Sequence, residues 1–351
     1  MRICHVLTND QGGGLVYAEA LARGAQARGA EVEWLFTGTR QVHARAARRA
    51  YARADVIHCH GFRAALVAAP FSSRLVVTPH GSHVIRRTRG PRRWLALGCV
   101  RAATSRATAV VCVGREELDD LKALLGGQAH KLQLILNGSR RVAPPTREHR
   151  LAARRELGID EAAPVLAYIA RLEPHKDPTL AVRAFEHTLE LLPSARLIVA
   201  GGGSLAQPIR ALGMNGVHLL GQLPDASTVL LAADAVLNTS LWEGMSLSLL
   251  EAMWCGRPAV AVAAAGNRET IGDTGVLVES RDPRAIGAAA ASLLSNRRRL
   301  GSLGARARER AERLFDEDRM VEQTLELYEQ CVREAPHRAR TRTAPAGAGA
   351  R

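Results

Sequence analysis

The sequence predicts an α/β protein made of two parallel-sheet domains that face one central cleft. The chain has 351 residues and 47% hydrophobic content, which is enough to bury two cores. Apolar runs of strand length alternate with stretches of helix length along the chain. Glycine-rich turns or charged motifs follow many of the apolar runs, and in a parallel sheet these positions share the edge where ligands bind.

The first half is predicted to be a Rossmann-like domain, residues 1–145. It opens with the apolar strand Ile3–Leu7, the turn Gly12-Gly13-Gly14 and a helix from about Val16 to Arg28. Glycines without a Cβ let the backbone approach a ligand closely, although the turn lacks the G-x-G-x-x-G spacing. Further strands are predicted at 31–36, 55–60, 75–78, 107–113 and 132–136.

A second Rossmann-like domain is predicted for residues 146–332. The segment from Val142 to His149 is polar and broken by prolines, as expected of a linker. The second domain then opens with a strand at 165–170 and ends with helices at about 283–294, 297–315 and 318–332. Residues 336–351 are rich in Arg, Thr, Ala, Pro and Gly, a composition that predicts a disordered tail.

The formal charge of +14 lies entirely in the first half. Residues 1–150 contain 24 Lys and Arg against 10 Asp and Glu, and no acidic residue occurs from Val56 to Arg115. The arginines Arg86, Arg87, Arg89, Arg92 and Arg93 precede the apolar segment 94–97. This pattern suits an anionic membrane surface, an anionic or lipid-linked acceptor, or a merely solvated basic face.

The stretch from Ser240 to Met253 carries two carboxylates eight residues apart, Glu243 and Glu251. Gly244 interrupts the pattern after an apolar strand, and a helix is predicted to start at about Ser246. A helix start offers free N–H groups and a positive dipole end, which together attract an anion. A ligand with a charged middle and two hydroxyl-rich ends, such as a nucleoside diphosphate sugar, fits this arrangement.

This stretch resembles the Glu-x7-Glu segment of the retaining family 4 glycosyltransferases, which have the GT-B fold. Two further segments are similar to motifs of that family: Thr78-Pro79-His80-Gly81, and Arg171-Leu172-Glu173-Pro174-His175-Lys176-Asp177 with Ala170 and Asp177 in place of its two glycines. The resemblance covers about residues 1–332 and implies that the helix at about 318–332 crosses back to the first domain.

The resemblance implies a retaining transferase that uses a nucleotide sugar, with UDP as the default carrier, and no cofactor or metal. Arg171 and Lys176 would bind the diphosphate, while His80 and Glu243 would position the sugar. These four are the candidate catalytic residues. The implied donor-binding set also contains Gly13, Gly14, Gly202, Gln222, Leu223, Gly244, Met245, Ser246, Leu247 and Glu251.

Other site types and functions are less well supported by the sequence. His58 and His60 share one face of a strand, but no third ligand is apparent, so no metal is predicted. The few aromatic residues disfavour a nucleic-acid partner. A nucleotide-sugar 2-epimerase of the same architecture stays open as an alternative. The N-terminus enters a strand directly and no apolar run reaches 18 residues, so we expect a cytoplasmic protein that rests at most peripherally on a membrane.

Overall fold

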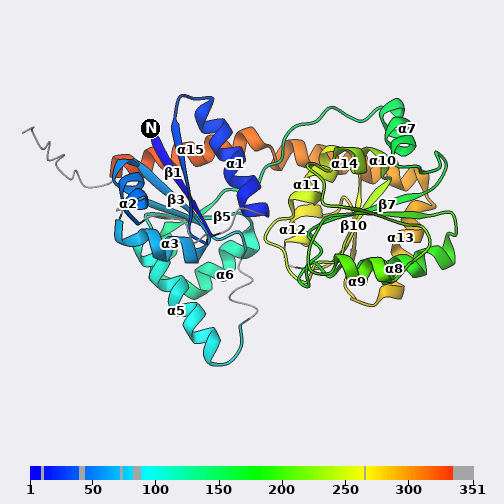
Figure 1. The fold of residues 1–351 in the computed structure, drawn as a ribbon, viewed down its shortest axis with the longest axis horizontal. Helices are drawn as coiled ribbons and strands as arrows, with labels where there is room; N and C mark the ends of the chain where they lie inside the picture. The colour runs from blue at the N-terminus through cyan, green and yellow to red at the C-terminus, as the bar shows by residue number, and fades with distance from the viewer. Residues whose placement is uncertain (9–11, 39–43, 72–73, 82–87, 265, 335–351) are drawn as a thin grey trace, which may run out of the picture.

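The computed structural model contains two parallel six-stranded sheets that lie side by side, each flanked by helices (Figure 1). It describes residues 1–8, 12–38, 44–71, 74–81, 88–264 and 266–334. The strand orders are β2-β1-β3-β4-β5-β6 and β12-β11-β10-β7-β8-β9. Both orders reverse beside the first strand of the sheet, the point at which open α/β sheets bind their ligands. The predicted fold class, two Rossmann-like domains of GT-B type, is confirmed.

The first sheet and its helices occupy residues up to Leu134. Its strands alternate with helices, as the apolar pattern predicted. The elements are β1 (Arg2–Leu7), α1 (Gly13–Gln26), β2 (Glu31–Phe36), α2 (Ala44–Arg53), β3 (Val56–His60), α3 (Phe62–Ala68), a 3-10 turn (Ala69–Phe71), β4 (Leu75–Thr78), α5 (Pro91–Arg106), β5 (Ala109–Cys112), α6 (Arg115–Leu125), a second 3-10 turn (Gly126–Lys131) and β6 (Leu132–Leu134).

The second sheet is preceded in the chain by one helix. These elements are α7 (Arg147–Glu156), β7 (Val165–Ile169), α8 (Pro178–Leu191), β8 (Arg196–Ala200), α9 (Ala206–Ala211), β9 (Val217–Gly221), α10 (Ser227–Ala232), β10 (Ala235–Asn238), α11 (Leu247–Trp254), β11 (Ala259–Val262), α12 (Asn267–Ile271), β12 (Val276–Val278), α13 (Pro283–Leu294), α14 (Arg297–Leu314) and α15 (Glu317–Glu334).

The last helix, α15, lies along the first sheet rather than the second (Figure 1). It packs against α1, and a Cβ placed on Gly24 of α1 would lie 2.3 Å from Val321 of α15. Gly24 therefore allows the two helix backbones to approach each other. The chain enters α15 through a parallel bridge between Ser139 and Asp316, where Arg141 also pairs with Asp316.

Helix boundaries show where sequence patterns were insufficient. The first helix begins at Gly13, three residues before the predicted start at Val16, so the glycine turn is itself the first turn of α1. Thr146 caps α7 by accepting a hydrogen bond from the backbone N–H of His149, so residues predicted as linker are already helical. The predicted disordered tail lies outside the described residues.

Within the described part of the chain, no helix combines the length and the apolar character that crossing a membrane requires.

Candidate functional site

The carboxyl ends of β1 and β4 from the first sheet meet those of β7 and β10 from the second sheet where the halves touch. We call this region the sheet junction. A Cβ placed on Gly244, after β10, would lie 3.0 Å from the carbonyl oxygen of His80, after β4. A Cβ on Gly13, at the start of α1, would lie 3.7 Å from the side chain of Leu247. The structure therefore brings Gly13, Gly244, Leu247 and His80 together, as the sequence analysis proposed for a shared ligand site.

Lys176 and Glu243 form the central ion pair of the sheet junction. Lys176 Nζ donates to Glu243 Oε1 at 2.6 Å and to Oε2 at 2.7 Å. Ser240 Oγ also donates to Oε1, at 2.6 Å. The side chains are 19% exposed for Lys176 and 7% for Glu243, so Lys176 is a largely buried cation. A cation and a carboxylate are thus held together, half-buried, where a charged ligand would enter.

Arg171 precedes Lys176 by five residues and is exposed. Its Nε would be 3.6 Å from a Cβ on Gly12, which places the guanidinium between the two halves. Asp177, which follows Lys176, adopts a left-handed conformation with φ 47°. This conformation explains why a glycine suits the position, and Asp is tolerated because its short polar side chain bonds locally. Its carboxylate caps α8 by accepting from the Leu180 N–H at 3.2 Å and pairs with Arg281 at 2.6 Å.

Helix α11 points its amino-terminal end into the sheet junction. Ser246 is the N-cap residue, as predicted, yet its side chain caps no backbone N–H, and the first turn contains no acidic residue. Instead, Ser246 Oγ bonds to Asn238 at 3.4 Å and to Ser248 at 3.1 Å. The first N–H groups of α11 are therefore not capped by this side chain, which leaves the positive end of the helix open to an anion.

Met245 is placed differently from the other predicted contacts. Its side chain is 6% exposed and belongs to an apolar core that also includes Leu250 and Trp254. Any contact of Met245 with a ligand would be made by its backbone.

Glu251 lies further along α11 and faces the loop that follows β9. Burial raises the pKa of its carboxyl to about 7, and the nearby charge of Asp225 adds to the shift. In the same part of the site, Gln222 approaches Gly202, whose added Cβ would lie 3.2 Å from Gln222 Oε1. Leu223 is the next residue of that loop and is half-buried. These members of the predicted donor-binding set thus lie around the loop that follows β9.

Four histidines lie at the edge of the first sheet in one aromatic cluster. His5 Nδ1 is 3.0 Å from His60 Nε2, and His60 Nδ1 is 3.0 Å from His80 Nε2. His58 hydrogen-bonds to Thr78 Oγ1 at 2.7 Å and to the Tyr328 hydroxyl of α15. Burial lowers the pKa of His5 to about 3 and that of His80 to about 4. The imidazoles are therefore neutral at physiological pH.

His5 supplies the third histidine that the sequence did not reveal. Nitrogen atoms of His5, His58 and His60 lie within 4.8 Å of one another, close enough to hold a metal ion. The strand register places His5 beside His58, because β1 pairs with β3. Only knowledge of the strand order could have identified this neighbour.

Glu117 is a second residue that the sequence analysis missed. It is buried on α6 and accepts hydrogen bonds from the N–H groups of Gly81, at 2.6 Å, and Val113, at 2.8 Å. Burial raises the pKa of Glu117 to about 7. Its position, four residues before the buried Leu121 and eight before Leu125, is a sequence signal for a carboxylate that faces the core. Glu117 holds the turn that carries His80.

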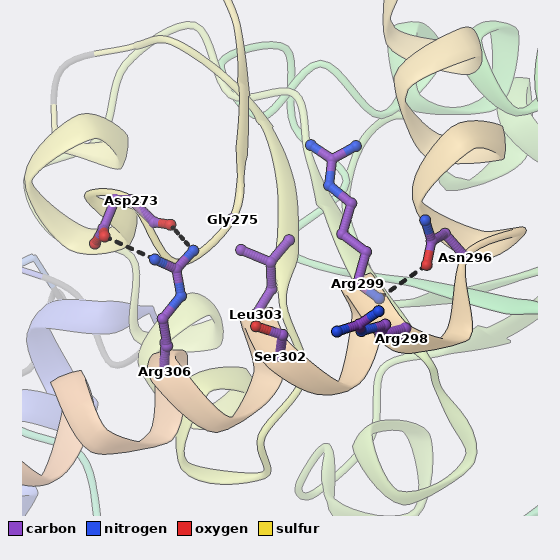
Figure 2. A pocket seen from close by; sticks show the side chains of 8 residues that line it. All are labelled: Asp273, Gly275, Asn296, Arg298, Arg299, Ser302, Leu303 and Arg306. Atoms are coloured by element: carbon purple, nitrogen blue, oxygen red, sulfur yellow. Dashed lines mark hydrogen bonds and ion pairs between the residues drawn. The ribbon is translucent and has the colours of Figure 1, made fainter.

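A hollow of about 520 Å³ lies away from the sheet junction, beside the start of α14 (Figure 2). It is lined by polar and basic side chains, among them Arg298, Arg299 and Arg306. Arg306 is already held by the carboxylate of Asp273 at 2.9 Å. None of the candidate site residues lines this hollow.

Two family models match the chain. The model described as glycosyl transferases group 1 matches residues 149–310, and the model described as glycosyltransferase family 4 matches residues 34–139. Together the two matches span the second sheet and β3 to β6 of the first, whereas β1 and the start of β2 lie outside them.

Individual proteins agree with these family models. A D-inositol 3-phosphate glycosyltransferase of Xylanimonas cellulosilytica is 29% identical over 94% of this chain and 94% of its own. A GDP-mannose-dependent monoacylated alpha-(1-6)-phosphatidylinositol monomannoside mannosyltransferase of Corynebacterium glutamicum is 30% identical over 49% of each chain. The structure of Anabaena HepE in complex with UDP and glucose matches with TM-score 0.79, at 20% identity, over 94% of this chain and 100% of its own.

Proposed function

The chain belongs to the group 1 glycosyltransferases of the family 4 type, and from that premise we propose that it transfers a sugar from a nucleoside diphosphate sugar to an acceptor hydroxyl with retention of configuration. The observation that carries this proposal is the convergence of Arg171, the Lys176–Glu243 pair and the start of α11 at the sheet junction. Two cations and a helix start together suit a diphosphate, while a carboxylate suits sugar hydroxyls.

The proposed reaction needs charge stabilisation at the departing phosphate. The bond between the anomeric carbon and the phosphate oxygen breaks, and the acceptor oxygen bonds to the same face of that carbon. The acceptor proton passes to the phosphate oxygen that leaves, so no side-chain base is required. Arg171, Lys176 and the α11 dipole stabilise the developing negative charge, a role in which fixed charges and dipoles contribute strongly. In this proposal no metal ion takes part.

For the donor we propose UDP-sugar first and GDP-sugar second. In this proposal the base stacks near Gln222, which approaches Gly202, and the Glu251 carboxylate accepts hydrogen bonds from the ribose hydroxyls. The Anabaena structure with UDP and glucose and the GDP-mannose-dependent mannosyltransferase represent these two possibilities among similar proteins.

A thermal-shift screen across UDP, GDP and ADP tests the donor assignment. A nucleotide at a hundredfold excess over its Kd stabilises the protein by about 2.7 kcal/mol. We expect one nucleotide to raise the Tm of the wild-type protein and to do so less for Arg171→Ala. Incubation of the matching nucleotide sugar without acceptor then separates a transferase from a 2-epimerase, because only the epimerase changes the sugar. No shift with any nucleoside diphosphate would contradict the proposal.

We place the acceptor at a membrane surface because of helix α5. Trp94 is 74% exposed and Leu95 is 72% exposed on the first turn of this helix, beside exposed Arg92. Helix α5 reaches the lower edge of the first half in Figure 1. Exposed aromatic and aliphatic side chains beside cations suit anionic lipid, and each cation near the surface contributes about 1 kcal/mol. Arg86 and Arg87 of the predicted basic cluster lie outside the described residues.

Vesicle co-sedimentation tests the membrane proposal. We expect binding to anionic vesicles at low salt, weaker binding at physiological salt, and loss of binding when Trp94 and Leu95 become Ser. The matched control is Leu191→Ser, which removes a side chain that is 61% exposed on α8 of the neutral half. Equal binding to neutral and anionic vesicles, or no binding at low salt, would favour a soluble acceptor.

A further inference from the structure

The three histidines His5, His60 and His80 form a hydrogen-bonded line that runs from the core to the sheet junction. Each step joins two ring nitrogens at 3.0 Å, and His60 uses both of its nitrogens. The rings of His5 and His60 are buried, and neighbouring centroids are 5.2 and 5.3 Å apart. A hydrogen bond between two neutral imidazoles requires one N–H and one lone pair. The protonation of one ring therefore dictates that of the next.

Only two arrangements of protons satisfy both hydrogen bonds. In the first, all three rings carry hydrogen on Nδ1, so His5 donates to His60 and His60 donates to His80. In the second, all three carry hydrogen on Nε2 and the bonds run in the opposite direction. A mixed arrangement would place two hydrogens, or none, between a pair of nitrogens.

The inner end of the line distinguishes the two arrangements. His5 Nε2 is buried and has no hydrogen-bond partner among the described residues. Its ring stacks on Trp34, with centroids 5.1 Å apart. Hydrogen on Nε2 would leave a buried N–H without an acceptor, which is rarer in proteins than a buried acceptor left unfilled. The arrangement with hydrogen on Nδ1 avoids that orphaned donor.

We propose that His5 and His60 act as positioning residues that hold His80 in the Nδ1–H tautomer, so that His80 presents a hydrogen-bond donor to an oxygen of the ligand. The outer ring nitrogen fits this role, because Nε2 of His80 faces His60 and Nδ1 has no partner among the described residues. His80 also adopts a left-handed backbone conformation with φ 62°, and Glu117 holds the following Gly81 N–H. Both the ring and its backbone are thus fixed by the protein. The ligand oxygen is a donor-sugar hydroxyl, an assignment that rests on the proposed function.

The same cluster does not need a metal to explain it. Both nitrogens of His58 and both nitrogens of His60 already have hydrogen-bond partners. A metal ion on His5, His58 and His60 would displace at least two of these bonds. The hydrogen-bonded line of His5, His60 and His80 keeps all of these bonds.

Nitrogen NMR of the full chain with ¹⁵N-labelled histidine tests the proposal directly, because long-range couplings report which ring nitrogen carries hydrogen. Twelve histidines are present, and single replacements assign the signals. At pH 7 we expect His5, His60 and His80 to be neutral and protonated at Nδ1. Protonation of His80 at Nε2, a mixture of its two tautomers, or a stoichiometric metal ion in the purified protein would overturn the proposal.

Two replacements of His60 provide a matched pair for kinetics. The amide of Asn mimics the Nδ1 side of His and can still donate to His80, whereas the amide of Gln mimics the Nε2 side and faces His5. With the matching nucleotide sugar, we expect His60→Gln to lower kcat about tenfold and to give His80 mixed tautomers. His60→Asn should keep kcat within about twofold and keep the Nδ1–H signal. Equal losses in both variants, with the His80 tautomer unchanged, would indicate a merely structural role.

The spectra and the transfer assay can fail separately. If His80 is fixed as the Nδ1–H tautomer but the protein acts on no nucleotide sugar, the hydrogen-bonded line is retained and the proposed function is rejected. Transfer activity in a protein whose His80 carries its hydrogen on Nε2 would support the proposed function and reject the proposed role of His5 and His60.

Discussion

At the sheet junction, the edge that comes from the basic first half is neutral, whereas the edge that comes from the neutral second half is charged. The first half has all the excess positive charge of the chain, yet its edge is lined by neutral imidazoles. The second half has equal numbers of basic and acidic residues beyond position 150, yet its edge carries exposed Arg171 and the Lys176–Glu243 pair. Net charge of a domain therefore says little about the charge of its site. The charged edge suits the diphosphate, whereas the neutral edge can only orient groups by hydrogen bonding.

The two edges also differ in their response to acid. A histidine whose folded pKa is lowered takes up its proton in the unfolded state first, so acid destabilises the fold. A carboxyl whose folded pKa is raised, such as Glu251 at about 7, is protonated first in the folded state, so acid stabilises it. Glu117 of the first half belongs to the second group and offsets part of the effect of its histidines.

The largest expected effect is loss of the charges at the second edge. Arg171→Ala and Lys176→Ala should each lower kcat/KM roughly 10- to 150-fold, because a charge-assisted hydrogen bond contributes about 1.5 to 3 kcal/mol. Lys176→Ala should also lower the Tm, since it leaves the buried Glu243 carboxylate without its cation. Arg171→Ala should leave the Tm unchanged because Arg171 is exposed. Wild-type kcat/KM in either variant would contradict the diphosphate assignment.

The next effect concerns the neutral edge. The unfolded pKa of His5 is 6.5 and its folded pKa is about 3, so stability is lost as pH falls below 6.5. At pH 5, titration of this one group should lower the free energy of unfolding by about 2 kcal/mol. His5→Asn removes the titrating ring, so between pH 8 and pH 5 we expect it to lose about 2 kcal/mol less unfolding free energy than the wild type. Urea unfolding at both pH values measures the difference, and identical pH dependence in the two proteins would show that His5 does not titrate as described.

The third effect separates the role of Glu251, on α11, from that of Glu243, on the loop before α11. Glu251→Gln should weaken binding of the free nucleoside diphosphate about tenfold, or about 1.4 kcal/mol, since a charged acceptor for the ribose is lost. Glu243→Gln should leave that binding nearly unchanged and lower kcat. Because burial raises the pKa of Glu251 to about 7, nucleotide binding should strengthen as pH rises through 7 in the wild type but not in Glu251→Gln. Calorimetry with the nucleotide alone checks both points, and equal effects of the two variants would refute this division.

The smallest effect provides a reference for the others. Arg268 pairs with Glu279 on the surface of the second half, where the two side chains are 53% and 70% exposed. Exposed ion pairs contribute about 0 to 1 kcal/mol. We expect Arg268→Ala to change neither nucleotide binding nor the unfolding free energy by more than about 0.5 kcal/mol. A larger loss of nucleotide binding would extend the charged edge beyond the residues described above.

The sequence by itself determined the fold class and the general alternation of strands and helices, although the start of α7 lies in the predicted linker. Periodicity and capping residues are local properties, which is why the predicted start of α11 lies within one residue of Leu247 and the bounds of α13 were predicted correctly. The motif residues after β4, β7 and β10 were named from the resemblance to the family, and their positions agree with the rule that parallel sheets bind ligands at the carboxyl ends of their strands.

The tertiary structure alone decided which distant side chains meet. His5 joins His60 only because β1 lies beside β3, and Glu117 reaches Gly81 only because α6 packs beneath that turn. Lys176 loses its exposure because Glu243, 67 residues away, lies within 2.6 Å of it. Burial and pairing of this kind depend on the summed packing of both sheets, and a linear pattern of residue types contains no measure of those distances.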